Sequence, residues 1–398
     1  MIYNSIGSIF IISAFILLIY SYLVMPRCYW KPKKYNNKKR YCILIPARYE
    51  SKVINNLLLS ITKQTTKINP KDIYIIVESI KDKTVDIAKQ YNMNIILREN
   101  LSLKRKGYAL NDAVTYILKK QIHYDAYFIF DADNILDKDF IKNMEKSINE
   151  GYDIGIGYRN TKNSNTLVSA SSALTFSMIN TMLNERKNKY HNNLTISGTG
   201  YYIKGSIVED WNSFPFHSLT EDYELTLYAI LNNLTTTYNK KAIFYDEQPD
   251  NFNVSLKQRT RWVKGYFEAR KKYINKISKS EIKNDPNFAS KVNAFLGVTP
   301  YIYIIIGLLI ILFNILITKG ITSFLCYLTI FLLLIYLVLS IFTTIMLKKE
   351  KNSLNISKSM KIKVIFYNPI FMFSYIICLL RTIFIKDIKW DKIDHNKN

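Results

Sequence analysis

The chain has 398 residues, of which 48% are hydrophobic, and its 55 Lys and Arg against 31 Asp and Glu give a formal net charge of +24. Much of this positive charge lies beside long apolar runs, where anionic lipid and membrane topology account for it, so we do not expect nucleic acid as a partner. The cysteines at positions 28, 42, 326 and 378 show neither paired metal-ligand spacing nor a disulfide framework.

The first apolar run, residues 1–26, carries no charge and exceeds the ~20 residues that cross a hydrocarbon core as a helix. No basic residue precedes it, and Met25-Pro26-Arg27 is a poor small-residue cleavage site, so we interpret it as a transmembrane helix rather than a cleaved signal peptide. Residues 27–40 form a basic juxtamembrane linker without an acidic residue. The positive-inside rule then places the N-terminus outside the plasma membrane and the following domain in the cytosol.

Residues 41–275 mix charge with short apolar stretches and are predicted to form one cytosolic domain. Short apolar strands alternate there with amphipathic helices. The predicted strands are 41–46, 73–77, 95–97 and 126–130, and the predicted helices are 53–64, 84–91 and 108–120. This alternation predicts an α/β fold with a parallel sheet, helices on both faces, and ligands at the carboxyl ends of the strands.

Two carboxylates follow the last of these strands directly. Asp131 and Asp133 come after the apolar strand 126–130, and their i, i+2 spacing aims both side chains the same way. Mg²⁺ or Mn²⁺ prefers carboxylate and phosphate oxygens, so both residues are candidate ligands of a divalent ion that holds a nucleotide diphosphate. An acidic turn after a strand, which is common, is the alternative reading.

A later segment, Gln258-Arg259-Thr260-Arg261-Trp262, brings three different side chains to one face of a helix. Positions i, i+3 and i+4 place Gln258, Arg261 and Trp262 together, so that an amide, a fixed cation and a flat aromatic ring converge. Such a face suits a sugar that carries a diphosphate. A helix that buries its tryptophan in a core while its arginines reach solvent would have the same spacing.

The C-terminal third of the chain contains further apolar runs. Residues 292–347 consist of two uncharged runs joined through Lys319 and are predicted to form a transmembrane hairpin that returns to the cytosol. Residues 364–385 contain Asn368-Pro369 and are predicted to be an interfacial or short transmembrane helix. Residues 386–398 form a tail with Trp390 and His395.

Six motifs occur in order along the chain. They are Pro46-Ala47-Arg48-Tyr49-Glu50, Lys106-Gly107-Tyr108-Ala109-Leu110-Asn111, Asp131-Ala132-Asp133, Gly198-Thr199-Gly200, Thr220-Glu221-Asp222 and Gln258 to Trp262. Together they resemble the family 2 glycosyltransferases of GT-A fold, in particular membrane synthases such as those for hyaluronan, cellulose and poly-N-acetylglucosamine. The resemblance covers roughly residues 40–275 by motif and the flanking segments by layout. It implies a Rossmann-like nucleotide-sugar-binding sheet combined with transmembrane helices.

The resemblance also implies roles for single residues. Asp222 matches the general base, which would deprotonate an acceptor hydroxyl opposite the leaving group and so invert the anomeric configuration. Locally, the acidic residues 221, 222 and 224 could instead be a first helical turn that favours the helix dipole. The implied donor contacts are Pro46, Glu50, Glu78, Lys106 and Asp131. The implied acceptor and diphosphate contacts are Gly198, Thr199, Gly200, Glu221, Gln258, Arg261 and Trp262.

Several of these assignments have plain structural alternatives. Lys106 follows two other basic residues and could belong to a solvated loop, and the glycines around Thr199 could form an ordinary turn before a strand. Glu78 stands where many relatives carry aspartate. Trp390 and His395 resemble a tail of bacterial members, for which exposed tail residues are the default reading.

The resemblance implies a metal-dependent, inverting transferase that uses a UDP-sugar, with UDP-N-acetylglucosamine as first expectation and UDP-glucose as second. The expected acceptor is a growing β-linked polysaccharide, and the alternative is a single addition to a membrane lipid. Three or four membrane spans are few for a polymer channel, so an accessory subunit or a homo-oligomer is a possible partner. A non-catalytic membrane scaffold is the remaining alternative.

Overall fold

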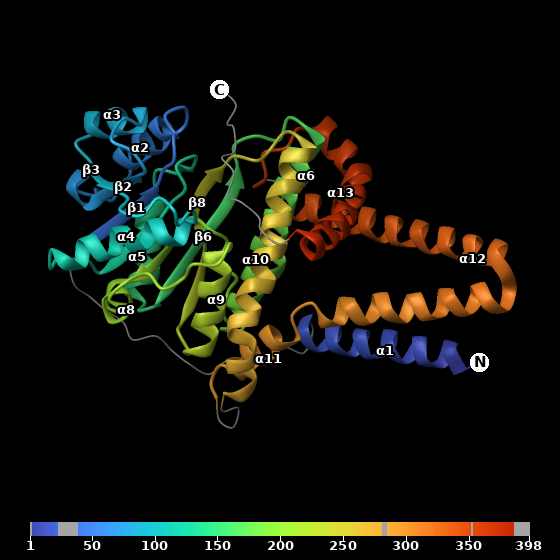
Figure 1. Ribbon diagram of the computed structural model, residues 1–398. Helices are drawn as coiled ribbons and strands as arrows, with labels where there is room; N and C mark the ends of the chain where they lie inside the picture. Colours follow the sequence, from blue (N-terminus) through green and yellow to red (C-terminus); the bar gives the residue numbers. More distant parts are fainter. Residues whose placement is uncertain (1, 23–38, 281–284, 352, 386–398) are drawn as a thin grey trace.

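The computed structural model describes residues 2–22, 39–280, 285–351 and 353–385 (Figure 1). Residues 27–38 of the predicted linker lie outside the described residues. The same holds for residues 386–398, which include Trp390 and His395. A domain built around one sheet lies beside a group of long helices (Figure 1).

Eight strands form a single sheet in the order β3-β2-β1-β4-β7-β6-β8-β5. The strands are β1 (Tyr41–Pro46), β2 (Ile73–Val77), β3 (Asn94–Leu97), β4 (Ala126–Ile129), β5 (Ile135–Leu136), β6 (Ile154–Thr161), β7 (Tyr201–Lys204) and β8 (Thr236–Asp246). The first four strands in the order pair in parallel, as predicted. The complete sheet is mixed, because β7 enters between β4 and β6 and runs antiparallel to both.

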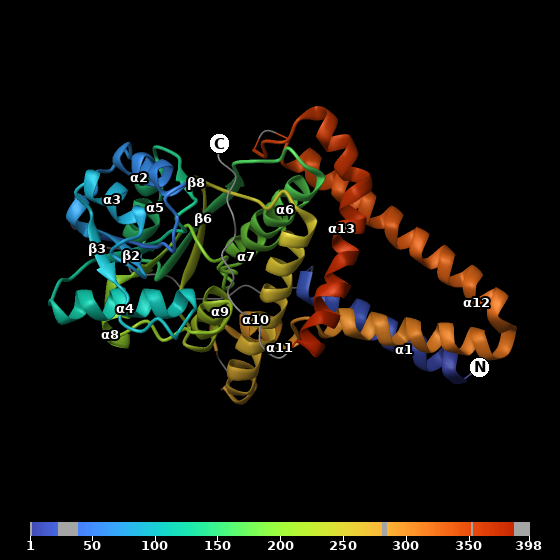
Figure 2. The ribbon, with the colours of Figure 1, turned by 45° about the horizontal axis from the view of Figure 1, so that its top comes forward.

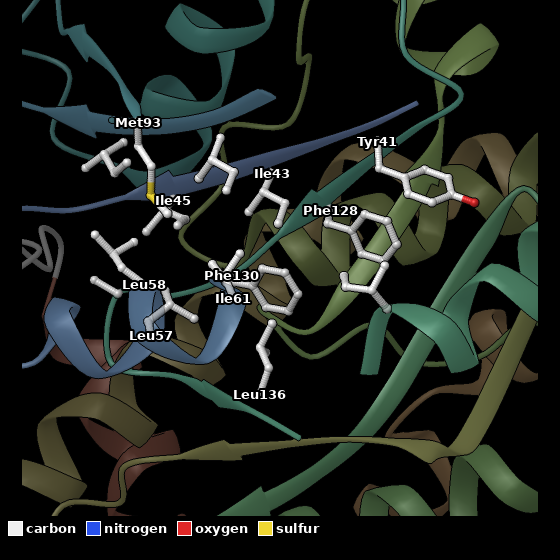
Figure 3. Packing of buried hydrophobic residues seen from close by; sticks show 14 of the residues in the cluster. Tyr41, Ile43, Ile45, Leu57, Leu58, Ile61, Met93, Phe128, Phe130 and Leu136 are labelled. Atoms are coloured by element: carbon white, nitrogen blue, oxygen red, sulfur yellow. The ribbon is translucent and has the colours of Figure 1, made fainter. Parts of the chain in front are cut away.

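The strands bury side chains on both faces of the sheet. Ile43 and Ile45 of β1 belong to the core under one face, whereas Cys42 and Leu44 belong to the core under the other. Figure 3 shows the first of these cores, in which Phe128 and Phe130 pack near β1. Because successive side chains of a strand point to opposite faces, a continuous apolar run such as residues 41–45 suits a sheet that is covered on both sides.

Helices cover the two faces as the alternating pattern requires. The first core contains side chains of α2 (Ile54–Thr62), α3 (Lys83–Gln90) and α5 (Phe140–Asn149). The second core contains side chains of α4 (Lys106–Lys119), α8 (Gly205–Trp211) and α9 (Glu221–Leu231). A short 3₁₀ helix, η1 (Pro70–Asp72), leads into β2.

A layer of helices lies between the sheet domain and the long hairpin, as Figures 1 and 2 both show. It contains α6 (Leu167–Met178), α10 (Phe252–Lys279) and α13 (Lys358–Phe384). α6 continues through a π-helical turn, η2 (Ile179–Asn184), into α7 (Glu185–Lys189). Arg259 of α10 is buried and holds α13: its guanidinium donates to the Ser374 hydroxyl at 2.6 Å and lies 4.0 Å from the centre of the Phe371 ring.

Three helical stretches among the described residues are long and apolar enough to cross a membrane: Tyr3–Ser21, Phe288–Lys349 and Lys358–Phe384. The first is part of α1 (Ile2–Tyr22), and the second joins α11 (Phe288–Leu296) to α12 (Thr299–Lys349). α12 reverses direction at Gly320, where φ is +76° (Figure 1). Gly297 separates α11 from α12, and Arg270 caps α11 by donating to the carbonyls of Ala294 and Phe295.

α1 packs closely along α12. A Cβ built on Gly307 would lie 2.6 Å from the Gly7 carbonyl oxygen, so the two backbones meet where neither residue has a side chain. Asn314 donates to Asn4 at 2.8 Å on the same contact. Small residues that allow close backbone approach, together with polar pairs, are typical of helix contacts in membranes.

Candidate active site

A cleft of about 530 Å³ opens at the carboxyl ends of the parallel strands. The loops after β1, β2 and β4 line it on the sheet side, and α6, α9, α10 and α13 line it on the other. Of the predicted site residues, those in the lining are Pro46, Glu50, Glu78, Lys106, Asp131, Asp133, Gly198, Glu221, Asp222, Gln258, Arg261 and Trp262. One cavity therefore collects side chains from positions that span more than two hundred residues of sequence.

Two neighbouring carboxylates at the start of α9 face this cleft. Burial raises the pKa of Glu221 to about 7 against the opposing charge of Lys106. Burial also raises the pKa of Asp222, whereas the Tyr223 amide and the nearby Lys106 and Arg159 cations oppose the shift. A carboxylate whose pKa lies above its usual range is suited to accept a proton near neutral pH.

The third acidic residue of this helix turn has a structural task. Glu224 accepts hydrogen bonds from the backbone amides of His217 and Ser218, at 3.1 and 2.9 Å, and so caps the loop that precedes α9. All three acids lie in the first turn of α9, as the helix-dipole alternative requires. Glu221 and Asp222 differ from Glu224 because they also line the cleft.

Lys106 is the central cation of the site. Its ammonium donates to Asp131 at 2.5 Å and to the Gly198 carbonyl at 2.6 Å, and it lies 3.7 Å from Glu221. Burial disfavours the charged ammonium, but the Asp131 and Glu221 carboxylates outweigh this effect and raise the pKa of Lys106. The backbone of Gly107, the next residue, packs directly against the Phe216 carbonyl, where a Cβ would have no room. This contact holds Lys106 in place at the start of the helix. Lys106 does not belong to a solvated loop.

One face of α10 supplies the opposite wall. Gln258, Arg261 and Trp262 all line the cleft, in agreement with the helical spacing read from the sequence. Burial lowers the pKa of Arg261, and the nearby carboxylates of Glu221 and Asp131 partly oppose this shift. The Trp262 ring meets the Phe176 ring of α6 edge to face at 5.6 Å between centroids.

The loops after β1 and β2 form the far end of the cleft. Glu78 is paired with Arg48 at 3.0 Å, and Arg98 lies 3.8 Å from its other oxygen. Asp82 fixes the loop after β1 by accepting from the Tyr49 amide at 2.8 Å, where Tyr49 has a φ of +57°. These contacts hold the Pro46 to Glu50 loop in position beside Glu78.

Two predicted acceptor contacts lie behind the cleft wall instead of in it. Thr199 is fully buried: its hydroxyl accepts from the Asp131 amide at 2.9 Å and donates to Asn134. At Gly200 a Cβ would lie 2.1 Å from the Phe244 ring, and φ is +68°. Glycine is required there for packing and backbone conformation, and Thr199 supports Asp131 from behind.

The side chains present fit a divalent ion held jointly with a nucleotide. Asp131 and Asp133 both line the cleft. No group of three or more His, Cys, Asp or Glu side chains arranged for a metal occurs among the described residues. Mg²⁺ is usually bound by one or two carboxylates plus substrate phosphates, so a two-carboxylate site is appropriate for an ion that arrives with a diphosphate.

Several cleft residues carry no motif that sequence reasoning detected. Arg159 of β6 forms a salt bridge with Asp246 of β8, donates to the Ser197 carbonyl at 2.8 Å, and lies 3.6 Å from the centre of the Phe176 ring. Tyr375 of α13 also lines the cleft. In the sequence, Arg159 is marked only by its place at the polar end of an otherwise apolar strand. No feature of the neighbouring sequence marks Tyr375 as a cleft residue.

Comparisons with known proteins agree with this geometry. The family model described as "Glycosyltransferase like family 2" matches residues 39–265. The protein described as "Probable glycosyltransferase YdaM" from Bacillus subtilis (strain 168) is 25% identical over 256 residues, which cover 59% of this chain and 57% of that relative's length. The mannosyltransferase PcManGT from Pyrobaculum calidifontis, solved with GDP-Man and Mn²⁺, has a TM-score of 0.60 at 13% identity and covers 97% of this chain and 100% of that one. At this identity the structural likeness concerns the fold.

Proposed function

The chain belongs to glycosyltransferase family 2, and we propose that this enzyme transfers a sugar from a UDP-sugar to a growing β-linked polysaccharide, with Asp222 as general base. UDP-N-acetylglucosamine is the first expected donor and UDP-glucose the second. Because the mannosyltransferase of the same fold was solved with GDP-Man, GDP-mannose joins the panel of donors to test.

The observation that carries the proposal is the placement of Asp222. This partly buried carboxylate, with its raised pKa, shares one cleft with the Lys106 and Arg261 cations and with the candidate metal ligands. Asp222 would take the proton of the acceptor hydroxyl while the bond from the anomeric carbon to the diphosphate breaks. Attack opposite the leaving group converts an α-linked donor into a β-linked product.

Lys106 and Arg261 would meet the negative charge that develops on the departing diphosphate. A divalent ion bound by Asp131 and Asp133 would supply further positive charge to the same phosphates. Trp262, with Phe176 against its edge, offers an aromatic surface for a sugar ring. Mn²⁺ or Mg²⁺ is the proposed cofactor.

A single addition to a membrane lipid is the second candidate. It is supported by Phe176 and Tyr375 in the cleft lining, because their helices α6 and α13 both contact the long apolar helix α12. We place the enzyme in the plasma membrane with its catalytic domain in the cytosol and its N-terminus outside. An accessory subunit or a second copy of the chain would complete a path for a polymer.

The test uses the detergent-purified full chain with Mn²⁺ or Mg²⁺ and a panel of UDP-sugars and GDP-mannose, and follows nucleotide release and product mass together. The polysaccharide proposal predicts nucleotide release with a ladder of products, which Asp222→Asn abolishes. Release with one sugar added to lipid would support the second candidate. No release from any donor would contradict both and favour a scaffold. An α-linkage in the product would contradict inversion.

A further inference from the structure

A second, smaller cavity adjoins the catalytic cleft, and Thr195, Tyr223 and Tyr266 line both. Its volume is about 220 Å³, and it is enclosed by α7, the loop after it, α9, α10 and α11. Gly297 and Val298, immediately before α12, also line it, so it lies where the catalytic domain meets the apolar hairpin. Neither proposed transferase activity uses this cavity.

α9 forms a wall shared by the two cavities. Glu221 and Asp222 face the cleft, whereas Thr226, Leu227 and Ile230 line the second cavity. Tyr223 borders both cavities and stacks on Tyr266 of α10 with centroids 4.9 Å apart. The residue next to the proposed base therefore touches the second cavity.

The polar lining of this cavity contains one cation, which has no acidic counter-charge there. Lys187 of α7 lines it and donates to the Thr195 hydroxyl at 3.2 Å. Burial lowers the pKa of Lys187 to about 8, with no acidic group contributing to the shift. No acidic residue occurs among the described residues that line the cavity. A partly buried ammonium beside a single hydroxyl is stabilised when an anion completes its surroundings.

Two side-chain amides add unused hydrogen-bonding capacity. The Asn293 side-chain nitrogen is buried and has no hydrogen-bond partner among the described residues, and the same is true of the Asn193 side-chain oxygen. The orientation of Asn193 is fixed because its side-chain nitrogen donates to the Leu234 carbonyl at 2.8 Å. The lining thus contains a cation with one hydroxyl partner, together with an N–H donor and an acceptor that have no partner among the described residues.

We propose that this cavity is a binding site for a phosphate group, with Lys187 as its cation, separate from the nucleotide-sugar cleft. The Asn293 amide donates to a second phosphate oxygen, and Asn193 accepts from a protonated phosphate oxygen or from a hydroxyl of the same ligand. Inorganic phosphate and the phosphate of a lipid headgroup share this chemistry. The position beside α12 makes both sources reachable.

The test measures binding to the full chain in neutral detergent by equilibrium dialysis, with radiolabelled inorganic phosphate in one arm and dihexanoyl phosphatidic acid in the other. Wild type is compared with Lys187→Met, and with Lys189→Met as the matched control, because Lys189 is exposed on the same short helix. Phosphate bound in the catalytic cleft contributes equally to all three proteins, so differences between them report the second cavity. Thermal unfolding and nucleotide release verify that each variant is folded.

We expect wild type and Lys189→Met to bind one phosphate ligand and Lys187→Met to bind it about tenfold more weakly or worse, as for loss of a charge-assisted hydrogen bond. If phosphatidic acid binds more tightly than inorganic phosphate, the ligand is the phosphate of a lipid headgroup. If inorganic phosphate binds equally or more tightly, the ligand is the free ion. Unchanged binding by Lys187→Met, equal losses in both variants, or no binding by wild type would overturn the proposal. Lys187→Gln replaces Lys187→Met if the latter does not fold.

Discussion

The Lys106 ammonium lies 2.5 Å from a carboxylate oxygen of Asp131. The proposed diphosphate-binding cation and a proposed metal ligand are therefore in contact with each other. An ammonium and a divalent ion would share the same carboxylate, so metal and nucleotide are expected to bind together and to redistribute these contacts.

Lys106→Met distinguishes the effect of Lys106 on metal binding from its effect on turnover. Without nucleotide, the variant should bind Mn²⁺ more tightly than wild type, because Asp131 loses its competing cation. With donor present, its turnover should fall by about 10² or more, because one cation fewer stabilises the negative charge on the departing diphosphate. Titration of Mn²⁺ and steady-state nucleotide release measure the two quantities. Lys119→Met is the matched control, because Lys119 is exposed on the same helix α4 and does not line the cleft; a comparable loss of turnover in that variant would contradict the specific role of Lys106.

The pH profile should report the proposed base at the start of α9. Burial raises the pKa of both Glu221 and Asp222. A protonated Asp222 cannot accept a proton, so kcat/KM should fall as the pH drops through its raised pKa, which lies above the ~4 of an ordinary carboxyl. Burial and the charge of Asp222 raise the pKa of Glu221 to about 7, whereas Glu221 is not among the charges that raise the pKa of Asp222, so Glu221→Gln should leave the acidic limb in place. A limb that moves to lower pH in this variant would show that a charged Glu221 raises the pKa of the base.

Metal dependence should involve Asp133. Chelation should abolish nucleotide release by the wild-type enzyme. In Asp133→Asn the Mn²⁺ concentration for half-maximal activity should rise by about tenfold or more, because one of two carboxylate ligands is lost. Asp86→Asn alters an exposed carboxylate on α3 and should leave this concentration unchanged. Full activity of wild type in a chelator would rule out the proposed cofactor.

Arg259→Ala should loosen the attachment of α13 to α10. The variant loses the hydrogen bond to Ser374 and the packing against the Phe371 ring, and leaves a cavity between the helices. A loss of about 2 kcal/mol or more is expected from such a change. Thermal unfolding in detergent measures it, with the exposed Lys257→Ala as control. Equal unfolding temperatures for the two variants would mean that Arg259 does not anchor α13.

The sequence predicted those parts of the site that follow strands or share a helix face. Asp131 and Asp133 could be found because an apolar strand ends directly before them, and Arg261 and Trp262 because helical spacing brings them together. Arg159 and Tyr375 could not be found in this way. The pairing of β6 with β8 places Arg159, and the docking of α13 places Tyr375, and both depend on contacts between distant parts of the chain.

In the sheet and in the last apolar helix, too, some features follow from the local sequence and others depend on contacts with distant residues. The βαβ pattern predicted the parallel half, but no local feature indicates that β7 would enter the sheet in the opposite direction. Asn368-Pro369 suggested an interrupted helix over residues 364–385. In the structure α13 continues through Pro369, and the Asn368 side chain donates to Thr343 of α12 at 2.9 Å. A neighbouring helix thus supplies a polar contact beside the proline.

The central claim, that Asp222 is the general base, is tested most directly by single-turnover nucleotide release in Asp222→Asn, with donor binding measured on the same preparation. Asparagine preserves the shape of the side chain but accepts no proton. We predict donor affinity within a few-fold of wild type and a rate lowered by about 10²–10⁴, whereas Asp210→Asn, an exposed change on α8, keeps the wild-type rate. An Asp222→Asn rate close to that of wild type, with donor bound equally well, would contradict the assignment.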